Sequence, residues 1–245
     1  MIRVIESVNN PTLKELCKKV KSPSADCFFL EGTRFVEELP VDCVLEVYTS
    51  DPKKHEAFLK TLPKERTVYY LSAAAMKKLC SAVSDQTIAC TVRRIPTKRP
   101  HKLVLLDGVQ DPGNVGTVIR TAYAFGFGVV LFPGCANPWS PKTLMSTAGA
   151  FRSCHIESTQ DPLAFLQELK ADGFSVFATA LDPTAVPPEE ISFGENRAVI
   201  IGSEGKGVSP EVLKNADQTV FIPMQNPINS LNAASAASIM IYALK

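Results

Sequence analysis

Hydrophobic residues in the second half of the chain form short, nearly continuous runs, and longer stretches with a helical pattern separate these runs. Such runs between helices are typical of a parallel sheet that is buried on both faces. The predicted strands are residues 103–106, 129–132, 175–178, 198–201 and 219–222. We therefore predict an α/β fold with a mostly parallel sheet, helices on both of its faces, and a ligand site beyond the carboxyl ends of the strands.

The first half of the chain shows a similar alternation and predicts a smaller α/β domain at residues 1–95. Its predicted strands are 27–30, 43–48, 67–70 and 87–92, and its predicted helices are 12–20 and 73–79. Residues 93–102 combine two prolines with six Lys, Arg or His side chains, which favours an extended and solvated connection. We place a linker at residues 96–102 and the second domain at residues 103–245.

Charge is unevenly distributed along a chain whose net charge is only +1. Residues 1–102 hold 18 Lys and Arg against 12 Asp and Glu, a net charge of +6, whereas residues 103–245 hold 8 against 13, a net charge of −5. This asymmetry predicts an anionic partner for the first half, with nucleic acid as the common case.

Composition restricts the other classes of function. The seven cysteines and three histidines show neither Cys-x-x-Cys spacing nor a set at metal-ligand spacing, so we expect no disulfide framework and no metal. The longest weakly polar stretch, residues 231–244, is shorter than the run of about 20 apolar residues that spans a membrane. The first residues do not resemble a secretory signal, so we expect a cytoplasmic protein.

A first polar segment follows the predicted strand at 103–106 and opens a helix. Asn114 is placed to act as the helix N-cap. Arg120 stands alone in an otherwise apolar helix, which favours a role facing a site. Gly113 and Gly116 do not supply the glycine spacing of a dinucleotide fingerprint.

A second segment, residues 199–210, places three glycines after a strand and before a helix that Ser209 can cap. A phosphate loop is excluded because Lys206 is followed by glycine rather than Ser or Thr. Glu204 would also repel phosphate, and it suits a cationic ligand such as a sulfonium or the guanidinium of Arg120.

The third segment, residues 221–240, joins the last strand to a terminal helix rich in Ala and Ser. Ser230 is predicted to cap this helix, and Asn232 is predicted to lie in its first turn. The small residues of the helix allow a close approach of the backbone.

Together and in order, these segments resemble the motifs of the SpoU (TrmH-like) family of RNA ribose 2′-O-methyltransferases in the SPOUT superfamily. The motif residues are Asn114, Arg120, Gly202, Glu204, 222–224 and 230–232. The resemblance covers residues 103–245. It departs at 233–235, where the family usually has a β-branched residue after the asparagine.

The resemblance implies a trefoil knot in the second domain, bound S-adenosylmethionine, and a homodimer with a site near the subunit interface. The positions that match cofactor contacts are Thr179, Gly202, Ile222, Met224 and Leu231. The implied catalytic residues are Asn114, Arg120, Glu204, Ser230 and Asn232. More loosely, residues 1–95 resemble the ribosomal-protein-like domain with which several members bind their substrate.

The implied reaction is in-line attack of a ribose 2′-hydroxyl on the sulfonium methyl, a step to which positioning can contribute roughly 7–11 kcal/mol. Because a guanidinium stays protonated, we expect Arg120 to stabilise the developing alkoxide and a nearby phosphate, with Glu204 orienting it. Asn114, Ser230 and Asn232 are expected to fix the hydroxyl.

The expected substrate is RNA, with large-subunit rRNA favoured by the additional domain and tRNA as the alternative. A non-catalytic RNA-binding protein on the same fold is a second alternative. A nucleotide-binding α/β enzyme would need a phosphate loop or a dinucleotide fingerprint, and the sequence has neither.

Overall fold

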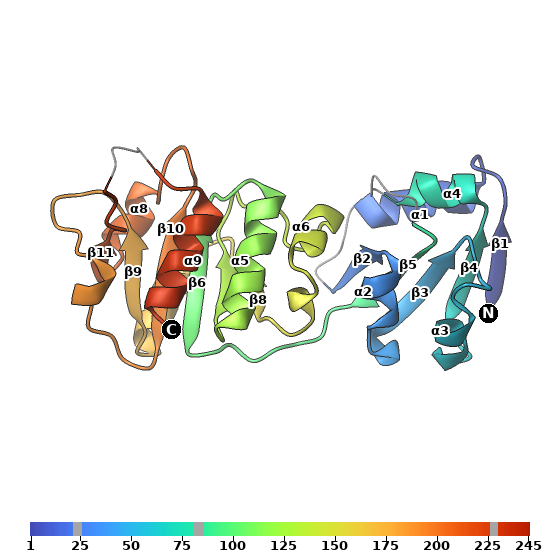
Figure 1. The fold of residues 1–245 in the computed structure, drawn as a ribbon, viewed down its shortest axis with the longest axis horizontal. Helices are drawn as coiled ribbons and strands as arrows, with labels where there is room; N and C mark the ends of the chain where they lie inside the picture. The colour runs from blue at the N-terminus through green and yellow to red at the C-terminus, as the bar shows by residue number, and fades with distance from the viewer. Residues whose placement is uncertain (22–25, 81–85, 226–229) are drawn as a thin grey trace. The chain divides into compact units, whose positions relative to one another are not determined.

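The computed structural model describes residues 1–21, 26–80, 86–225 and 230–245. The chain divides into two compact units, which are coloured from blue to red along the sequence in Figure 1. Unit 1 consists of Met1–Ile95 together with Trp139–Leu144, and unit 2 consists of Pro96–Pro138 together with Met145–Lys245.

Unit 1 is built on a mixed sheet whose strand order, in the described residues, is β1-β4-β3-β5-β2. The strands β1 and β3 both pair with β4 in parallel, whereas β5 pairs with β3 and β2 antiparallel. The strands are β1 (Ile2–Ile5), β2 (Cys27–Glu31), β3 (Val44–Thr49), β4 (Thr67–Leu71) and β5 (Ile88–Arg93). All four predicted strands are confirmed, and β1 is an addition whose four residues are too few to show a period.

Two layers of short helices cover this sheet. The helices are α1 (Pro11–Lys21), α2 (Thr33–Glu37), α3 (Glu56–Thr61) and α4 (Ala73–Leu79), with a 3₁₀ turn η1 (Val41–Cys43). Leu13 and Leu16 of α1 and Met76 of α4 share one core with Phe29 and Tyr48 of the sheet. The helices α1 and α4 therefore cover the same face, and α2 and α3 lie on the other side of the strands in Figure 1.

Unit 2 is built on a sheet in which every described strand pair is parallel, in the order β11-β9-β10-β6-β7-β8. The strands are β6 (Lys102–Asp107), β7 (Gly128–Leu131), β8 (Ile156–Ser158), β9 (Ser175–Thr179), β10 (Arg197–Gly202) and β11 (Gln218–Val220). The predicted parallel sheet is confirmed. The strand predicted at 219–222 ends at Val220, so that Ile222 lies in the following loop, because only Gln218–Val220 pairs with β9.

Helices cover both faces of the second sheet, as predicted. They are α5 (Pro112–Ala124), α7 (Pro162–Ala171), α8 (Pro210–Lys214) and α9 (Ala233–Ala243), with 3₁₀ turns η2 (Ala150–Arg152) and η3 (Pro188–Glu190). The short helix α6 (Pro141–Ser146) starts in the segment that belongs to unit 1. Leu166 and Leu169 of α7 and Val212 of α8 share a core with the strands. The helices α5 and α9 lie side by side on the opposite face (Figure 1).

Within the predicted linker at 96–102, Arg99 contacts unit 2, and the bounds of the linker stay a prediction. The Arg99 guanidinium donates to Glu168 at 2.6 Å and, through its Nη2, to both carboxylate oxygens of Glu157 at 3.1 Å. These carboxylates bind the Arg99 side chain and thereby attach the segment to unit 2. Lys102 already belongs to β6. The segment Trp139–Leu144, which the sequence did not assign to unit 1, packs there because the Trp139 ring stacks on Phe28.

None of the described helices is long and apolar enough to span a membrane. The described part of the chain also contains no group of three or more His, Cys, Asp and Glu side chains that could hold a metal ion.

Candidate active site

The start of α5 differs by one turn from the prediction. Asp111, rather than Asn114, is the N-cap, because its carboxylate accepts a hydrogen bond from the Asn114 backbone N–H at 2.9 Å. Pro112 fits the first helical position, where no backbone donor is required. The prediction of Asn114 as N-cap is therefore wrong, and its amide side chain is available for other contacts.

The start of α9 also differs from the prediction. Asn232 is the N-cap, since its Oδ1 accepts from the backbone N–H groups of Ala234 at 2.9 Å and Ser235 at 3.3 Å. Ser230 was predicted to cap this helix and lies two residues before the cap. The Asn232 Nδ2 group donates to Asn114 Oδ1 at 3.0 Å, so one side chain both caps α9 and joins it to α5.

The loop after β10 is folded back on itself. Ser203 and Gly207 exchange two backbone hydrogen bonds, at 2.9 Å and 3.2 Å. A Cβ atom on Gly202 would lie 2.0 Å from the Gly207 carbonyl carbon, so only glycine fits at the end of this strand. Gly207 itself has φ +67°, which glycine adopts without strain.

Three of the predicted catalytic residues form one hydrogen-bonded series at the carboxyl edge of the sheet. The Asn114 Nδ2 group donates to Glu204 Oε1, and Asn114 in turn accepts from Asn232. We call Glu204, Asn114 and Asn232 the polar series. It connects the β10 loop to the first turns of α5 and α9, which are far apart in the sequence.

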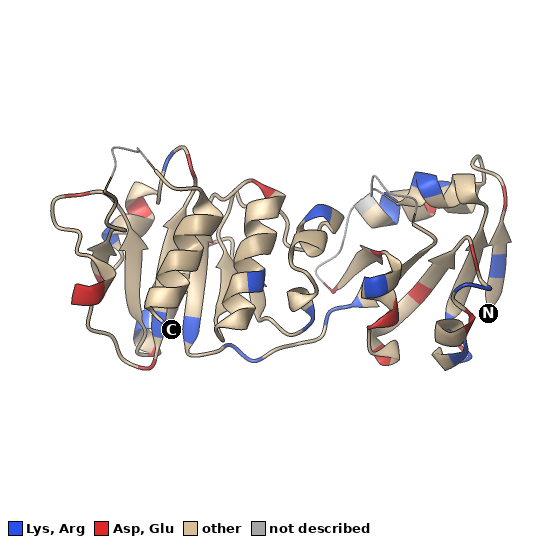
Figure 2. Ribbon diagram, viewed as in Figure 1, with Lys and Arg blue, Asp and Glu red and all other residues tan. Residues whose placement is uncertain are grey.

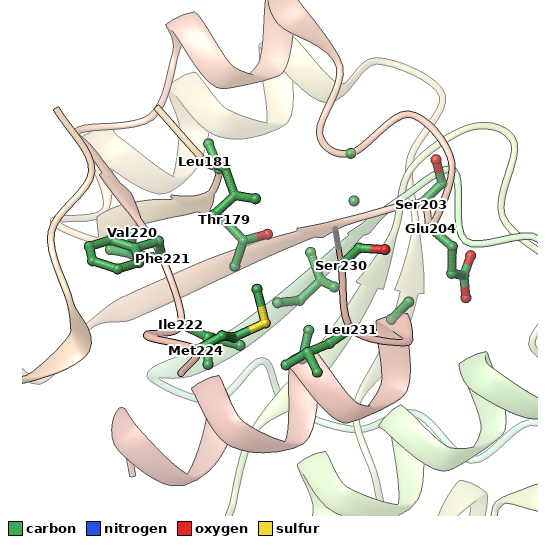
Figure 3. A pocket seen from close by; sticks show the side chains of 16 residues that line it. Thr179, Leu181, Ser203, Glu204, Val220, Phe221, Ile222, Met224, Ser230 and Leu231 are labelled. Carbon is green, nitrogen blue, oxygen red and sulfur yellow. The ribbon is translucent and has the colours of Figure 1, made fainter. Parts of the chain in front are cut away.

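A pocket of about 320 Å³ lies beside the polar series, between the carboxyl ends of β9, β10 and β11 and the start of α9 (Figure 3). All five residues predicted to contact a cofactor line this pocket: Thr179, Gly202, Ile222, Met224 and Leu231. The predicted catalytic residues Glu204 and Ser230 also line it. Residues 226–229 of the predicted third segment lie outside the described residues.

The pocket contains residues that the sequence analysis did not single out. Leu181 and Phe221 contribute apolar side chains, and Ala233 and Ala236 of α9 leave room that larger residues would fill. The small residues of α9 were a signal for close approach, but not for a pocket. The Thr179 hydroxyl donates to the Ile200 carbonyl at 3.0 Å, so that it joins β9 to β10 at the pocket wall.

Comparison with known proteins identifies this arrangement. The model of the family described as "SpoU rRNA Methylase family" matches residues 101–242, which is more than half of the chain. The chain belongs to the SpoU rRNA methylase family. The predicted family is thereby confirmed, and so is the predicted class of enzyme, an RNA methyltransferase that uses S-adenosylmethionine.

Individual relatives of this SpoU protein cover most or all of the chain. It is 34% identical over 252 residues, covering all of both chains, to the 23S rRNA (guanosine(2553)-2′-O)-methyltransferase RlmP of Bacillus subtilis. It is 29% identical to the 23S rRNA (guanosine-2′-O-)-methyltransferase RlmB of Acinetobacter baylyi, covering 84% of this chain and 90% of that protein.

Solved structures resemble both units. A TrmH-family structure from Porphyromonas gingivalis, described as a possible RNA methyltransferase, matches with a TM-score of 0.81 and 25% identity, covering 96% of this chain and 97% of that one. An rRNA methyltransferase from Sinorhizobium meliloti, solved with AdoMet bound, has a similar fold with a TM-score of 0.83 at 24% identity, covering 99% and 97%.

Arg120 of the SpoU domain is not brought to the polar series. It follows Asn114 by six residues, which on a helix is about 9 Å along the axis and about 240° around it. Its side chain is exposed, and Glu204 contacts Asn114 instead. The predicted Glu204–Arg120 pair is therefore absent from the described residues, because the helix phase directs Arg120 away from Asn114, which Glu204 contacts.

Two residues near the SpoU site were missed by the sequence analysis. Asp107, at the end of β6, accepts from the Ser209 backbone N–H at 2.7 Å and so holds the far side of the β10 loop. A carboxylate at the end of a buried strand was the available signal. Cys135 donates to the Leu106 carbonyl at 3.2 Å, and burial raises the pKa of its thiol, so it is poorly suited to act as a nucleophile.

Proposed function

We propose that this protein transfers a methyl group from S-adenosylmethionine to a ribose 2′-hydroxyl of 23S rRNA. The observation that carries the proposal is the largely apolar pocket that meets the polar series at Glu204. The full-length similarity to an enzyme named as a 23S rRNA guanosine 2′-O-methyltransferase supports rRNA as the substrate, with tRNA as the alternative. An rRNA substrate is also consistent with a cytoplasmic protein.

The pocket residues fit the cofactor. Met224, Leu231 and Ile222 offer apolar surface, and the bare backbone at Gly202 lets the loop after β10 pack closely against the strand at the pocket wall. We propose that these residues, with Thr179, hold S-adenosylmethionine. When bound, the cofactor supplies an electrophilic methyl group on a sulfonium. The knot that family membership implies for this part of the chain stays a prediction.

The polar series provides the groups that would hold the attacking hydroxyl. Asn114 and Asn232 have amide groups that can donate and accept hydrogen bonds, and Ser230 lies at the pocket wall beside them. We propose that these three side chains fix the 2′-hydroxyl. The oxygen would bond to the methyl carbon as the methyl–sulfur bond breaks, which leaves a neutral thioether, and the hydroxyl proton would pass to solvent water. A nearby cation would stabilise the partial negative charge on the oxygen as the proton leaves.

Arg120 is the proposed cation, and its position favours a homodimer. Arg120 is exposed on α5, and the neighbouring surface of α5 and α9 exposes Tyr123 (49%), Ile239 (42%) and Tyr242 (58%). An exposed apolar surface of this kind is typical of a protein interface. We propose that two copies associate through it, so that Arg120 acts at a site close to the interface.

Unit 1 is the proposed RNA-binding domain, because residues 1–102 carry a net charge of +6 and residues 103–245 a net charge of −5. A strongly anionic substrate would be repelled by the net charge of the SpoU domain alone. We therefore propose that unit 1 provides most of the affinity for RNA and that unit 2 provides the chemistry.

The test is methylation of a 23S rRNA transcript in the presence of S-adenosylmethionine, followed by mass spectrometry of the digested nucleosides. We expect one 2′-O-methylated nucleotide, and a transcript with a 2′-deoxy nucleotide at that position should bind but accept no methyl group. Methylation of tRNA alone, or methylation on a base, would contradict the proposal. Calorimetric titration with S-adenosylmethionine, ATP and NAD tests the non-catalytic and nucleotide-binding alternatives.

A further inference from the structure

The helices α1 and α4 of unit 1 form a layer that is apolar on the inside and basic on the outside. They are adjacent, since Cys17 of α1 donates to the Lys78 carbonyl of α4 at 3.7 Å. Lys14, Lys18 and Lys77 are exposed on the outer side, and Figure 2 shows the resulting blue bands on both helices. We call these three residues the lysine face. The two helices contain a single acidic residue, Glu15.

The cations on the lysine face have no acidic partner in the described part of the chain. Lys19 of α1 differs from these three lysines, because it forms an ion pair with Glu46 at 2.7 Å. No such pair involves Lys14, Lys18 or Lys77 among the described residues, so their charge is available to a ligand.

The opposite helix layer of unit 1 is electrostatically different. Its helices α2 and α3 carry balanced charges, and ion pairs form at Arg34–Glu38 (4.0 Å) and Lys60–Glu56 (2.7 Å). Arg99 of the basic linker is also paired, because Glu157 and Glu168 bind its guanidinium. The net charge of +6 on residues 1–102 is therefore not evenly available, and α1 and α4 present an uncompensated part of it.

We propose that the lysine face binds backbone phosphates of the RNA substrate. This inference rests on the proposed function and assigns the RNA-binding role of unit 1 to one surface. Lysine carries a compact charge on a flexible stem, which suits contact with phosphates and carries no information about base sequence. The lysine face therefore contributes affinity, and the choice of nucleotide is left to unit 2.

The experiment compares two triple variants of the full-length protein with S-adenosylmethionine present. Lys14→Gln/Lys18→Gln/Lys77→Gln neutralises the lysine face. The control, Lys53→Gln/Lys54→Gln/Lys64→Gln, removes the same charge from exposed positions around α3. Lys78 is kept, because its ammonium donates to the Val8 carbonyl at 2.8 Å and so supports the fold.

The measurement is the dissociation constant for a 23S rRNA transcript at several salt concentrations. Each lost phosphate contact reduces the slope of log affinity against log salt by roughly 0.7–0.9, so the first variant should lose about 2 to 3 from the slope. We expect its affinity to fall at least about tenfold near 0.1 M salt. Its KM for rRNA should rise while kcat stays unchanged, and the control should remain close to wild type.

Equal behaviour of the two variants would overturn the proposal, because binding would then follow net charge rather than a surface. Wild-type affinity in the first variant would overturn it directly. Failure of the proposed function is a separate result, in which the wild-type protein binds rRNA but transfers no methyl group. A wild-type protein that binds no RNA would overturn both.

Discussion

The two units of this chain have sheets of similar size, but they use them differently. In unit 2 every described strand pair is parallel, so the segments that follow β9, β10 and β11 meet at one edge and build the pocket. In unit 1 the strand β5 runs antiparallel to both of its neighbours, and the carboxyl ends of the strands are divided between two edges. Parallel topology concentrates loops, and therefore chemistry, in a way that the mixed sheet does not.

The surfaces of the two units differ in the corresponding way. Unit 2 places polar side chains at the carboxyl edge of its sheet, where Asn114, Glu204 and Asn232 bond to one another. Unit 1 carries part of its uncompensated charge on the outer sides of α1 and α4. The difference indicates a division of work, in which one unit holds the substrate and the other positions the reacting groups. Each variant below should affect only one side of this division.

The largest effect is expected from Gly202→Ala in unit 2. The added methyl group would lie 2.0 Å from the Gly207 carbonyl carbon, which is far too close for two non-bonded atoms, so β10 or its loop must move. We expect loss of S-adenosylmethionine binding and of activity, with a decrease in the free energy of unfolding of at least about 1–3 kcal/mol. Calorimetric titration and thermal unfolding measure the two effects.

Gly205→Ala is the matched control for this substitution. A Cβ atom at Gly205 meets nothing within 4 Å, and the backbone there does not require a positive φ. This variant should bind the cofactor as wild type does. If both alanine variants retained the cofactor, the loop after β10 would not be the wall of the cofactor site.

The strands could be predicted because buried strands leave strong local patterns, whereas the pocket residues came from the resemblance to the SpoU motifs. The helix caps could not be placed as well, because each helix start offers two suitable residues. Asp111 and Asn114 can both cap α5, and Pro112 decides in favour of Asp111 because it fits only the first position. Ser230 and Asn232 can both cap α9, and the contact of Asn232 with Asn114, 118 residues away in sequence, favours Asn232.

The predicted pair of Glu204 with Arg120 does not form among the described residues of the chain, for a similar reason. The prediction relied on both residues following strand ends, but it did not include the helix phase that separates Asn114 from Arg120. The position of Trp139–Leu144 in unit 1 left no local signal either, since it depends on the stacking of Trp139 on Phe28. Tertiary contacts of this kind are not encoded within a short window of sequence.

The second-largest effect is expected from Arg120→Ala. Because Arg120 lies away from the pocket on α5, cofactor affinity should stay at the wild-type value. Methyl transfer should fall by about 10²–10³, which is typical for loss of one group that stabilises developing negative charge. Single-turnover methylation of rRNA measures the effect. Wild-type turnover in this variant would remove Arg120 from the proposed mechanism, and Thr117→Ala on the same exposed helix surface serves as the control.

A smaller effect on stability is expected from Asn232, which has two roles that can be separated. Asn232→Ala removes both the cap of α9 and the link to Asn114, and loss of a cap costs about 1 kcal/mol of the free energy of unfolding. Asn232→Ser retains a capping oxygen but is too short to replace the amide link. We expect Ser to restore stability without restoring methyl transfer. Equal recovery of both properties would show that Asn232 acts only as a cap.

The smallest effect is expected in unit 1, from Glu15→Gln. Glu15 is the acidic residue on the layer formed by α1 and α4, so its removal relieves a repulsion of RNA phosphates near the lysine face. Because exposed charges are screened by salt, the gain in rRNA affinity should be only about two- to threefold and should disappear at high salt. Glu65→Gln, which removes an exposed carboxylate outside these helices, should leave affinity unchanged. A gain in affinity in both variants, or in neither, would mean that RNA responds to the charge of unit 1 as a whole, and the contrast between its two helix layers would lose its functional meaning.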